Sequence, residues 1–257
     1  MSPGEQFSAF LTVVTKEIQR FSRIWVQTLL PPVVTTTLYF LVFGQVIGRR
    51  IGDMSGFEYI DFIVPGLIMM SVITNSYNNV VSSFYSAKFQ KHIEEMLVSP
   101  MPVYIMVLGF VVGGVARGLV VAMVVTLVAM FFAELRVEHL WVAVSMAILT
   151  ATLFALGGLL NGIFAQSFDD ISIIPNFVLT PLTYLGGIFY SIQLLPELWQ
   201  TVSLVNPILY VVNTFRFGLI GITDIPLVPA FAIISLATIG LFLLAIYLLQ
   251  RGHGIRS

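Results

Sequence analysis

Few residues in this chain could do chemistry, and the patterns that common catalytic centres require are missing. A phosphate-binding loop needs a glycine followed directly by a lysine and a serine or threonine. None of the three lysines follows a glycine. The three histidines, His92, His139 and His253, lie far apart, and the chain has no cysteine. We therefore expect no catalytic residue, no metal and no directly bound cofactor.

The most unusual charged residue is Arg117, which lies near the middle of a long apolar run, residues 103–132. An arginine inside a bilayer costs at least ~2.5 kcal/mol, so it should face protein, water or a partner. It could contact an anionic substrate group or a carboxylate of a second copy. It could equally reach the interface or bond carbonyls of a neighbouring helix. Asn161, in another apolar run, could line a translocation path or serve helix packing.

These polar residues lie in a very hydrophobic chain. Hydrophobic residues make up 58% of it and charged residues 10%, whereas a soluble domain has about 25% charged residues. Six stretches have the ~20 apolar residues that cross a bilayer. The predicted fold class is therefore all-α, a polytopic integral membrane protein with six transmembrane helices. They are 26–48, 61–83, 103–132, 139–163, 172–190 and 227–250.

Residues 5–24 have the pattern of an amphipathic helix. Apolar side chains that include Phe21 recur on one face, and Lys16, Arg20 and Arg23 lie on the opposite face. A helix of this kind lies in the membrane interface with its cations toward anionic lipids. An ordinary soluble amphipathic helix has the same pattern, but the position directly before a span favours the interfacial interpretation. No secretory signal is apparent, and the net charge of −1 gives no reason to expect nucleic acid binding.

Two polar or broken segments separate the spans. The first, residues 84–102, predicts a short amphipathic helix over 86–98 that ends before Pro100, because a residue preceding proline avoids helical angles. It is either a solvated turn or a surface that another protein holds. The second, residues 191–226, is too long for a turn. It predicts two short helices, about 194–204 and 208–220, that enter and leave one leaflet.

Both segments resemble the ABC-2 family of ABC transporter permeases. The first reads Glu94-x-x-Leu97-x-Ser99-Pro100, similar to the first cytoplasmic loop of that family. The second carries a proline followed by Asn-Pro-hydrophobic-x-Tyr and then by an arginine and a glycine. These residues are Pro196, Asn206, Pro207, Ile208, Leu209, Tyr210, Arg216 and Gly218. The order of these motifs on six spans extends the resemblance over essentially the whole chain, as one ABC-2 type transmembrane domain of residues 1–257.

The resemblance implies one half of the membrane channel of a bacterial ABC exporter. Two ATPase subunits would bind ATP and Mg²⁺ and would dock on the loop at 84–102. A second permease copy, most simply in a homodimer, would complete the channel. Phe89, Ile93 and Leu97 would fill a groove on the ATPase, and the charged residues would set the register. The predicted docking residues are Phe89, Lys91, Ile93, Glu94, Glu95, Met96 and Leu97.

The distribution of lysine and arginine favours cytoplasmic N- and C-termini in the inner membrane. The segments inside in this topology hold seven such residues, and those outside hold four. The inside set is Lys16, Arg20, Arg23, Lys88, Lys91, Arg251 and Arg256. The outside set is Arg49, Arg50, Arg136 and Arg216.

Two other function classes fit a protein with six spans. A secondary transporter would work without an ATPase, but it needs carboxylates inside the membrane for cation coupling. Only Arg117 is clearly a charged residue within a span, which argues against a carrier. A membrane scaffold is compatible with the sequence. Members of the resembled family export drugs, polysaccharides and other amphiphiles, and nothing in the sequence selects one of these substrates.

Overall fold

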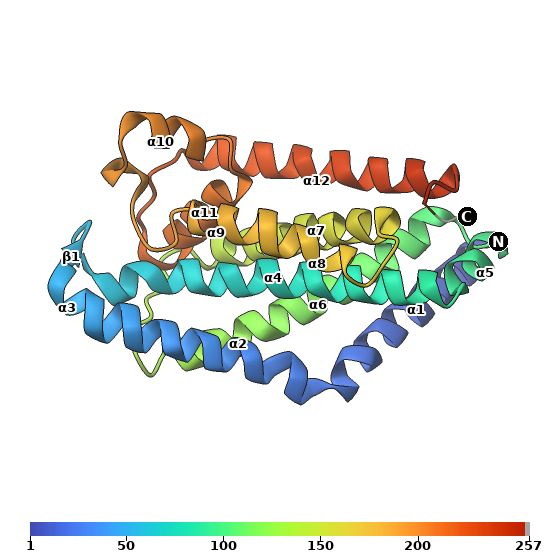
Figure 1. Ribbon diagram of the computed structural model, residues 1–257, viewed down its shortest axis with the longest axis horizontal. Coiled ribbons are helices and arrows are strands. Elements are labelled where there is room, and N and C mark those ends of the chain that lie inside the picture. Colours follow the sequence, from blue (N-terminus) through green and yellow to red (C-terminus); the bar gives the residue numbers. More distant parts are fainter. Residues whose placement is uncertain (255–257) are drawn as a thin grey trace.

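The computed structural model describes residues 1–254, and helices dominate it (Figure 1). The N-terminus, α5 (His92–Val98) and the end of α12 (Leu227–Gln250) lie at one end of the molecule, here called the terminal end. The hairpin of β1 (Asp53–Met54) and β2 (Phe57–Glu58), with α3 (Gly48–Ile51) and α10 (Glu197–Ser203), lies at the opposite, distal end. The elements in chain order are α1 (Pro3–Arg23), α2 (Trp25–Tyr39), η1 (Phe40–Ile47), α3 (Gly48–Ile51), β1 (Asp53–Met54), β2 (Phe57–Glu58), α4 (Tyr59–Phe89), α5 (His92–Val98), α6 (Val103–Ala129), α7 (Leu140–Phe164), α8 (Asp170–Ile174), η2 (Pro175–Leu179), α9 (Thr180–Tyr184), η3 (Ile192–Leu194), α10 (Glu197–Ser203), α11 (Pro207–Ile220) and α12 (Leu227–Gln250).

Five of the six predicted spans are confirmed as helices long and apolar enough to cross a membrane. The first combines α2, the π-helical segment η1 and α3 into one helix of 27 residues. The others are α4, α6, α7 and α12. A β-hairpin with strands of two residues each, in which Asp53 pairs with Glu58, joins the first helix to α4 at the distal end.

The span predicted at 172–190 is shorter than expected. Its helical part, α8, η2 and α9, ends at Tyr184. At 1.5 Å per residue it is about 22 Å long, less than the ~30 Å hydrocarbon core. The chain then leaves the helix at Gly186 and Gly187, and Gly187 has a φ of +71°, which L side chains rarely adopt. Ile188 follows and packs against Gly66 of α4.

The two short helices predicted after this segment are confirmed, close to their predicted limits. α10 and α11 meet at an angle of 88° and together have the composition of one broken span or a re-entrant loop. Asn206 explains the start of α11, because its Oδ1 accepts a hydrogen bond from the backbone N–H of Ile208 at 2.9 Å and caps the helix. Pro207 follows at the first helical position, where its missing N–H costs least.

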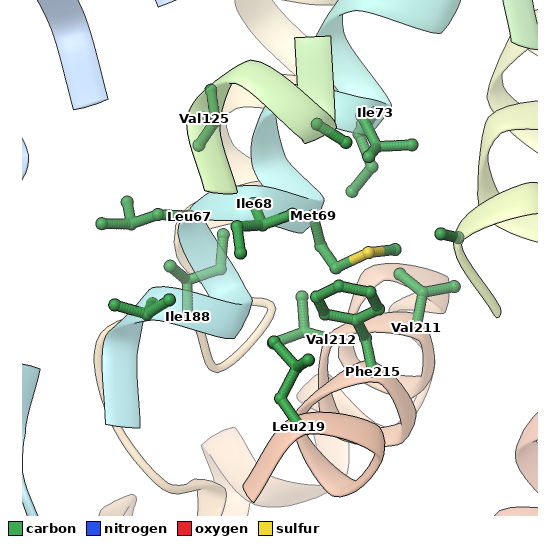
Figure 2. Close-up of a cluster of buried hydrophobic side chains, with 14 of the residues drawn as sticks. Leu67, Ile68, Met69, Ile73, Val125, Ile188, Val211, Val212, Phe215 and Leu219 are labelled. Carbon is green, nitrogen blue, oxygen red and sulfur yellow. The ribbon is translucent and has the colours of Figure 1, made fainter. Parts of the chain in front are cut away.

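The centre of the bundle is α4, which contacts α6, α7 and α11. Figure 2 shows one part of this core, where Ile68, Met69 and Ile73 of α4 meet Val125 of α6 and Phe215 of α11. α4 is the least hydrophobic of the five candidate spans and the most buried, whereas α12 is the most hydrophobic and among the most exposed. High hydrophobicity in an exposed helix is expected in a bilayer, because the lipids around a peripheral helix are themselves apolar.

Candidate docking surface and intramembrane cavity

The segment predicted to meet an ATPase begins with a sharp turn at the terminal end. α4 extends to Phe89, and Lys91 has a φ of 63°, in the left-handed region. α5 then runs from His92 to Val98. The prediction of one continuous helix over 86–98 is therefore wrong, because the turn divides it. The predicted end before Pro100 is confirmed.

Ile93 does not form the docking anchor that the sequence suggested. Its side chain has 0% exposure and packs in a core cluster with Phe84, Phe110 and Leu159. Met96 and Leu97 are partly buried against the same cluster. The turn at Lys91 folds the apolar face of α5 back onto α4, α6 and α7. This face therefore fixes α5 to the bundle instead of offering it to a partner.

The side chains that remain available at the terminal end form a different surface. Phe89, Val98 and Phe168 are exposed by 66%, 88% and 52%. The rings of Phe89 and Phe168 lie edge to face with centroids 5.3 Å apart. We define the docking surface as these three residues with their exposed charged and polar neighbours. Its members are Phe89, Lys91, His92, Glu94, Glu95, Val98 and Phe168.

The loop that carries Phe168 is held in place by two charged side chains. Lys88 Nζ donates hydrogen bonds of 2.7 Å to the carbonyls of Ile163 and Ala165, which would otherwise be unpaired at the end of α7. The carboxylate of Asp170 accepts hydrogen bonds from the backbone N–H groups of Gln166 and Ser167, at 2.8 and 3.0 Å. Phe168 thus projects from an ordered turn beside the end of α4.

α1 packs on α6 through a face that includes a charged residue. Val13, Glu17 and Phe21 are its buried residues. Gly113 of α6 makes room for Glu17, since a Cβ at that position would lie 2.5 Å from the Glu17 Cβ. Several apolar residues of α1 and the start of α2 point outward instead, as an interfacial helix requires. They are Phe7, Leu11, Ile18 and Trp25.

Arg20 is bound to protein and does not have the lipid-facing position that the sequence suggested. It pairs with the Glu17 carboxylate at 3.3 Å and donates to the backbone carbonyl of Asn79 at 2.9 Å and to its side-chain oxygen at 2.8 Å. Glu17 also accepts a hydrogen bond of 2.6 Å from Ser83. Lys16 and Arg23 are exposed, so only these two keep the predicted orientation toward the surroundings. The polar contacts attach α1 firmly to α4.

Arg117 lies at a cavity of about 280 Å³ between α2, α4 and α6. Its Nε is buried and has no hydrogen-bond partner among residues 1–254. Hydroxyl and amide side chains form much of the wall, and none of the lining residues is acidic. The lining residues are Gln27, Thr28, Pro31, Pro32, Thr35, Thr36, Tyr39, Leu67, Met70, Ser71, Thr74, Asn75, Asn78 and Arg117.

Arg216 has the opposite environment, although the sequence placed it among the outside charges. Its residue is 1% exposed, and its Nη2 donates to the carbonyl of Gly187 at 2.6 Å. Its Nε donates to the carbonyl of Phe62 at 3.2 Å, and the guanidinium lies 3.9 Å from the centroid of the Phe62 ring. Because it is buried, Arg216 gives no support to the predicted orientation, in which it was counted with the outside charges. It is a buried connector between α11, α4 and the turn after α9.

The remaining predicted residues of the re-entrant motif and the spans also have structural contacts. Tyr210 donates a hydrogen bond of 2.7 Å to the carbonyl of Leu204 and closes the bend between α10 and α11. Asn206 donates to the carbonyl of Leu182 at 2.6 Å. Asn161 donates to the carbonyl of Ile171 at 3.1 Å and does not line the Arg117 cavity. It links α7 to α8. Arg256, used in predicting the orientation, lies outside the described residues.

The sequence interpretation missed Val98 and Phe168 as surface residues. The available signal for Phe168 was an aromatic residue in the short polar loop after the fourth predicted span, and this signal is weak because single exposed apolar residues are common on protein surfaces. The hydroxyl and amide residues around Arg117 were missed too. Thr74 and Asn78 are one helical turn apart on α4, and this spacing could have indicated a polar face.

Comparison with known proteins gives a consistent result. The model of the ABC-2 type transporter family matches residues 8–220. The chain is 58% identical to the inner membrane transport permease YadH of Escherichia coli strain K12, over 97% of both chains. It is 22% identical to nodulation protein J of Rhizobium meliloti strain 1021, over 72% of this chain and 71% of that protein.

Proposed function

Because this chain belongs to the ABC-2 type transporter family, we propose that it forms, with a second copy of itself, the path by which an ABC exporter moves an amphiphilic substrate. The chain is a transport permease, the membrane component of an ABC transporter, and a bacterial inner membrane protein. A permease of this family works with an ATP-binding subunit. In the proposed assembly, two ATPase subunits bind ATP and Mg²⁺, the termini are cytoplasmic, and export is outward.

The docking surface is the observation that supports this proposal most directly. It exposes Phe89, Val98 and Phe168 at the end of the molecule that also carries the N-terminus. Aromatic anchors surrounded by charged residues are typical of protein interfaces, where a few buried aromatic side chains contribute most of the affinity. Lys91, Glu94 and Glu95 would lie at the rim and set the register.

The internal contacts suggest how movement of the ATPases would reach the membrane. α5 is fixed to the bundle by Ile93, and α1 is fixed to α4 by Glu17 and Arg20. Both elements would therefore move with α4 as one body. α4 has 31 residues and runs from the docking surface toward the distal end (Figure 1). Closure of the ATPase dimer on ATP would tilt α4 and alter the cavity along its side.

Co-purification with the ATPase tests the docking surface. The permease is tagged, expressed with the ATPase encoded beside it, and purified in mild detergent. We expect the ATPase to co-elute with the wild type and to be lost from Phe89→Asp combined with Phe168→Asp. These positions are exposed, so the permease itself should fold. Leu97→Asp is a poorer test because Leu97 is partly buried against the core.

Phe131→Asp is the matched control. Phe131 is an exposed aromatic residue, at 86%, and follows α6 at the other end of that helix. It should retain the ATPase. If the double variant keeps a full complement of ATPase, the docking surface is wrongly assigned. If no ATPase associates with the wild type, the proposed function itself fails.

A further inference from the structure

We propose that the cavity at Arg117 binds the anionic headgroup, a phosphate or a carboxylate, of an amphiphilic substrate. The inference rests on the proposed function and specifies its substrate class. The first argument is the state of the cation itself. A guanidinium at the middle of a span is costly unless it is paired. Arg117 forms no ion pair or side-chain hydrogen bond in the described part of the chain, and its Nε is buried.

The comparison with Arg216 shows what a structural arginine looks like in this protein. Arg216 donates to the carbonyls of Phe62 and Gly187 and stacks on an aromatic ring. Arg117 makes none of these contacts within residues 1–254. The carbonyl-bonding alternative that the sequence left open for Arg117 is therefore the one that Arg216 adopts. An anion from outside the chain would satisfy Arg117.

The wall of the cavity supplies further donors that are free. Gln27, Thr35, Thr74 and Asn78 line it, and their side chains make no hydrogen bonds to other residues in the range 1–254. Hydroxyl and amide N–H groups next to a guanidinium are the donors that phosphate and carboxylate oxygens accept. No lining residue is acidic, so nothing in the wall would repel an anion.

The size and position of the cavity favour an amphiphile over a free ion. A volume of about 280 Å³ is near the lower limit of small-molecule pockets, enough for a headgroup. The same wall contains Pro31, Leu67 and Met70, which are apolar. α2 borders the cavity and exposes Leu30, Val34 and Leu38 away from the core. Acyl chains attached to the headgroup could lie against these residues in the lipid.

A polar track connects the cavity with the docking surface. Most of α4 is buried, but Thr74, Asn78, Ser82 and Ser86 are not, and they recur every four residues. Positions four apart are neighbours on a helix surface, and each step turns about 40° further around the axis. The four residues therefore form a ridge that starts at the cavity and winds about 120° around α4 on its way toward Phe89. Hydroxyl and amide groups along it would accompany a charged headgroup that enters from the cytoplasmic side.

Binding of short-chain fluorescent lipids to the purified complex of permease and ATPase tests the proposal. The probes are phosphatidylglycerol, which is anionic, and phosphatidylcholine, which is zwitterionic, with inorganic phosphate as competitor. Charge-assisted hydrogen bonds of this kind correspond to roughly a tenfold change in affinity or more. We expect the wild type to prefer phosphatidylglycerol by at least about tenfold, and Arg117→Gln to lose that preference.

Two control variants separate the site from general lipid binding. Arg117→Lys keeps the charge and should keep part of the preference. Arg50→Gln removes an exposed arginine of α3 and should leave the preference unchanged. Arg117→Gln should still co-purify with the ATPase, because Arg117 is not part of the docking surface and makes no ion pair or side-chain hydrogen bond within residues 1–254.

Each opposing result has a definite meaning. A wild type that binds both lipids equally, or an Arg117→Gln variant that keeps the preference, overturns the inference. Inorganic phosphate could displace phosphatidylglycerol at a phosphate concentration no higher than the lipid concentration that half-fills the site. In that case the site recognises a free anion, and an amphiphilic ligand is excluded. Absence of the ATPase from the wild-type preparation would refute the proposed function. This outcome is measured by co-purification and does not depend on the lipid-binding result.

Discussion

Replacing Gly158 by alanine should destabilise the bundle, whereas replacing its neighbour Gly157 should not. A Cβ at Gly158 would overlap the carbonyl oxygen of Tyr77 and would lie 3.2 Å from the carbonyl carbon. A Cβ at Gly157 would lie 3.6 Å from the Tyr77 ring, an ordinary contact. The two glycines are adjacent on α7, and both variants gain the same helix propensity, about 0.5–1 kcal/mol. The difference in unfolding free energy between the two variants therefore reports the contact between α7 and α4 alone.

The expected difference in stability between the two variants depends on which atoms must move to make room for the new Cβ. Forcing extra atoms into a packed core costs typically 1–3 kcal/mol. The obstacle to Gly158→Ala is the backbone of α4, which cannot change rotamer, so we expect a difference of about 2–3 kcal/mol. The Tyr77 ring beside Gly157 can shift slightly. α4 and α7 are closely packed along much of their length, so separation at this point would loosen other contacts too.

The assay is SDS-induced unfolding of each purified variant, followed by far-UV circular dichroism and compared at equal protein and detergent concentrations. Gly158→Ala should unfold at a clearly lower SDS fraction than Gly157→Ala. Equal midpoints for the two variants would show that α4 and α7 do not approach as closely as the structure has them, and the reasoning would be refuted.

Three further predictions concern Arg216 and Ile93, whose roles the structure changed, and Val98, which the sequence interpretation missed. Arg216→Gln should destabilise the protein by roughly 3 kcal/mol or more in the same assay, because it removes the buried hydrogen bonds to the carbonyls of Phe62 and Gly187 and the contact with the Phe62 ring. A loss below about 1 kcal/mol would contradict the burial of Arg216. Ile93→Ala should cost about 2–5 kcal/mol of stability, as expected for a large side chain removed from a core. Val98→Ala should leave stability unchanged and weaken ATPase co-purification, and the reverse pattern would restore Ile93 as the docking residue.

Much of the fold could be predicted from hydrophobicity alone. The bilayer fixes the length of a span, so a run of apolar residues marks a helix with little ambiguity. Five spans were located to within six residues at either end on this basis. The length of the helix in the stretch 172–190 was overestimated, because hydropathy shows that a segment is apolar but does not show where its helix ends. The helix runs through Pro175 and Pro181 and ends at Tyr184, before Gly186 and Gly187 turn the chain and bring Ile188 against Gly66 of α4.

The assignment of individual side chains failed where it required knowing which neighbour a face meets. Ile93 lies on the apolar face of an amphipathic helix, and the periodicity is the same whether that face meets a partner or its own chain. The left-handed turn at Lys91 directs this face toward its own chain. Lysine is not a residue type that predicts a left-handed backbone conformation. Glu17 and Arg20 were similarly ambiguous, because a charged face can pair with polar groups of α4 as well as with lipids.

Two arginines in apolar stretches, Arg117 and Arg216, show what the structure adds to the composition. Both Arg117 and Arg216 are single charges in apolar sequence, and each could have been a ligand contact or a structural connector. Arg216 donates hydrogen bonds to buried backbone carbonyls of two other segments, and its guanidinium serves the fold. Arg117 lies instead at a cavity where four polar side chains, those of Gln27, Thr35, Thr74 and Asn78, make no hydrogen bond within residues 1–254. The free energy of placing an unpaired guanidinium there has to be recovered elsewhere, and binding an anion is the step that recovers it.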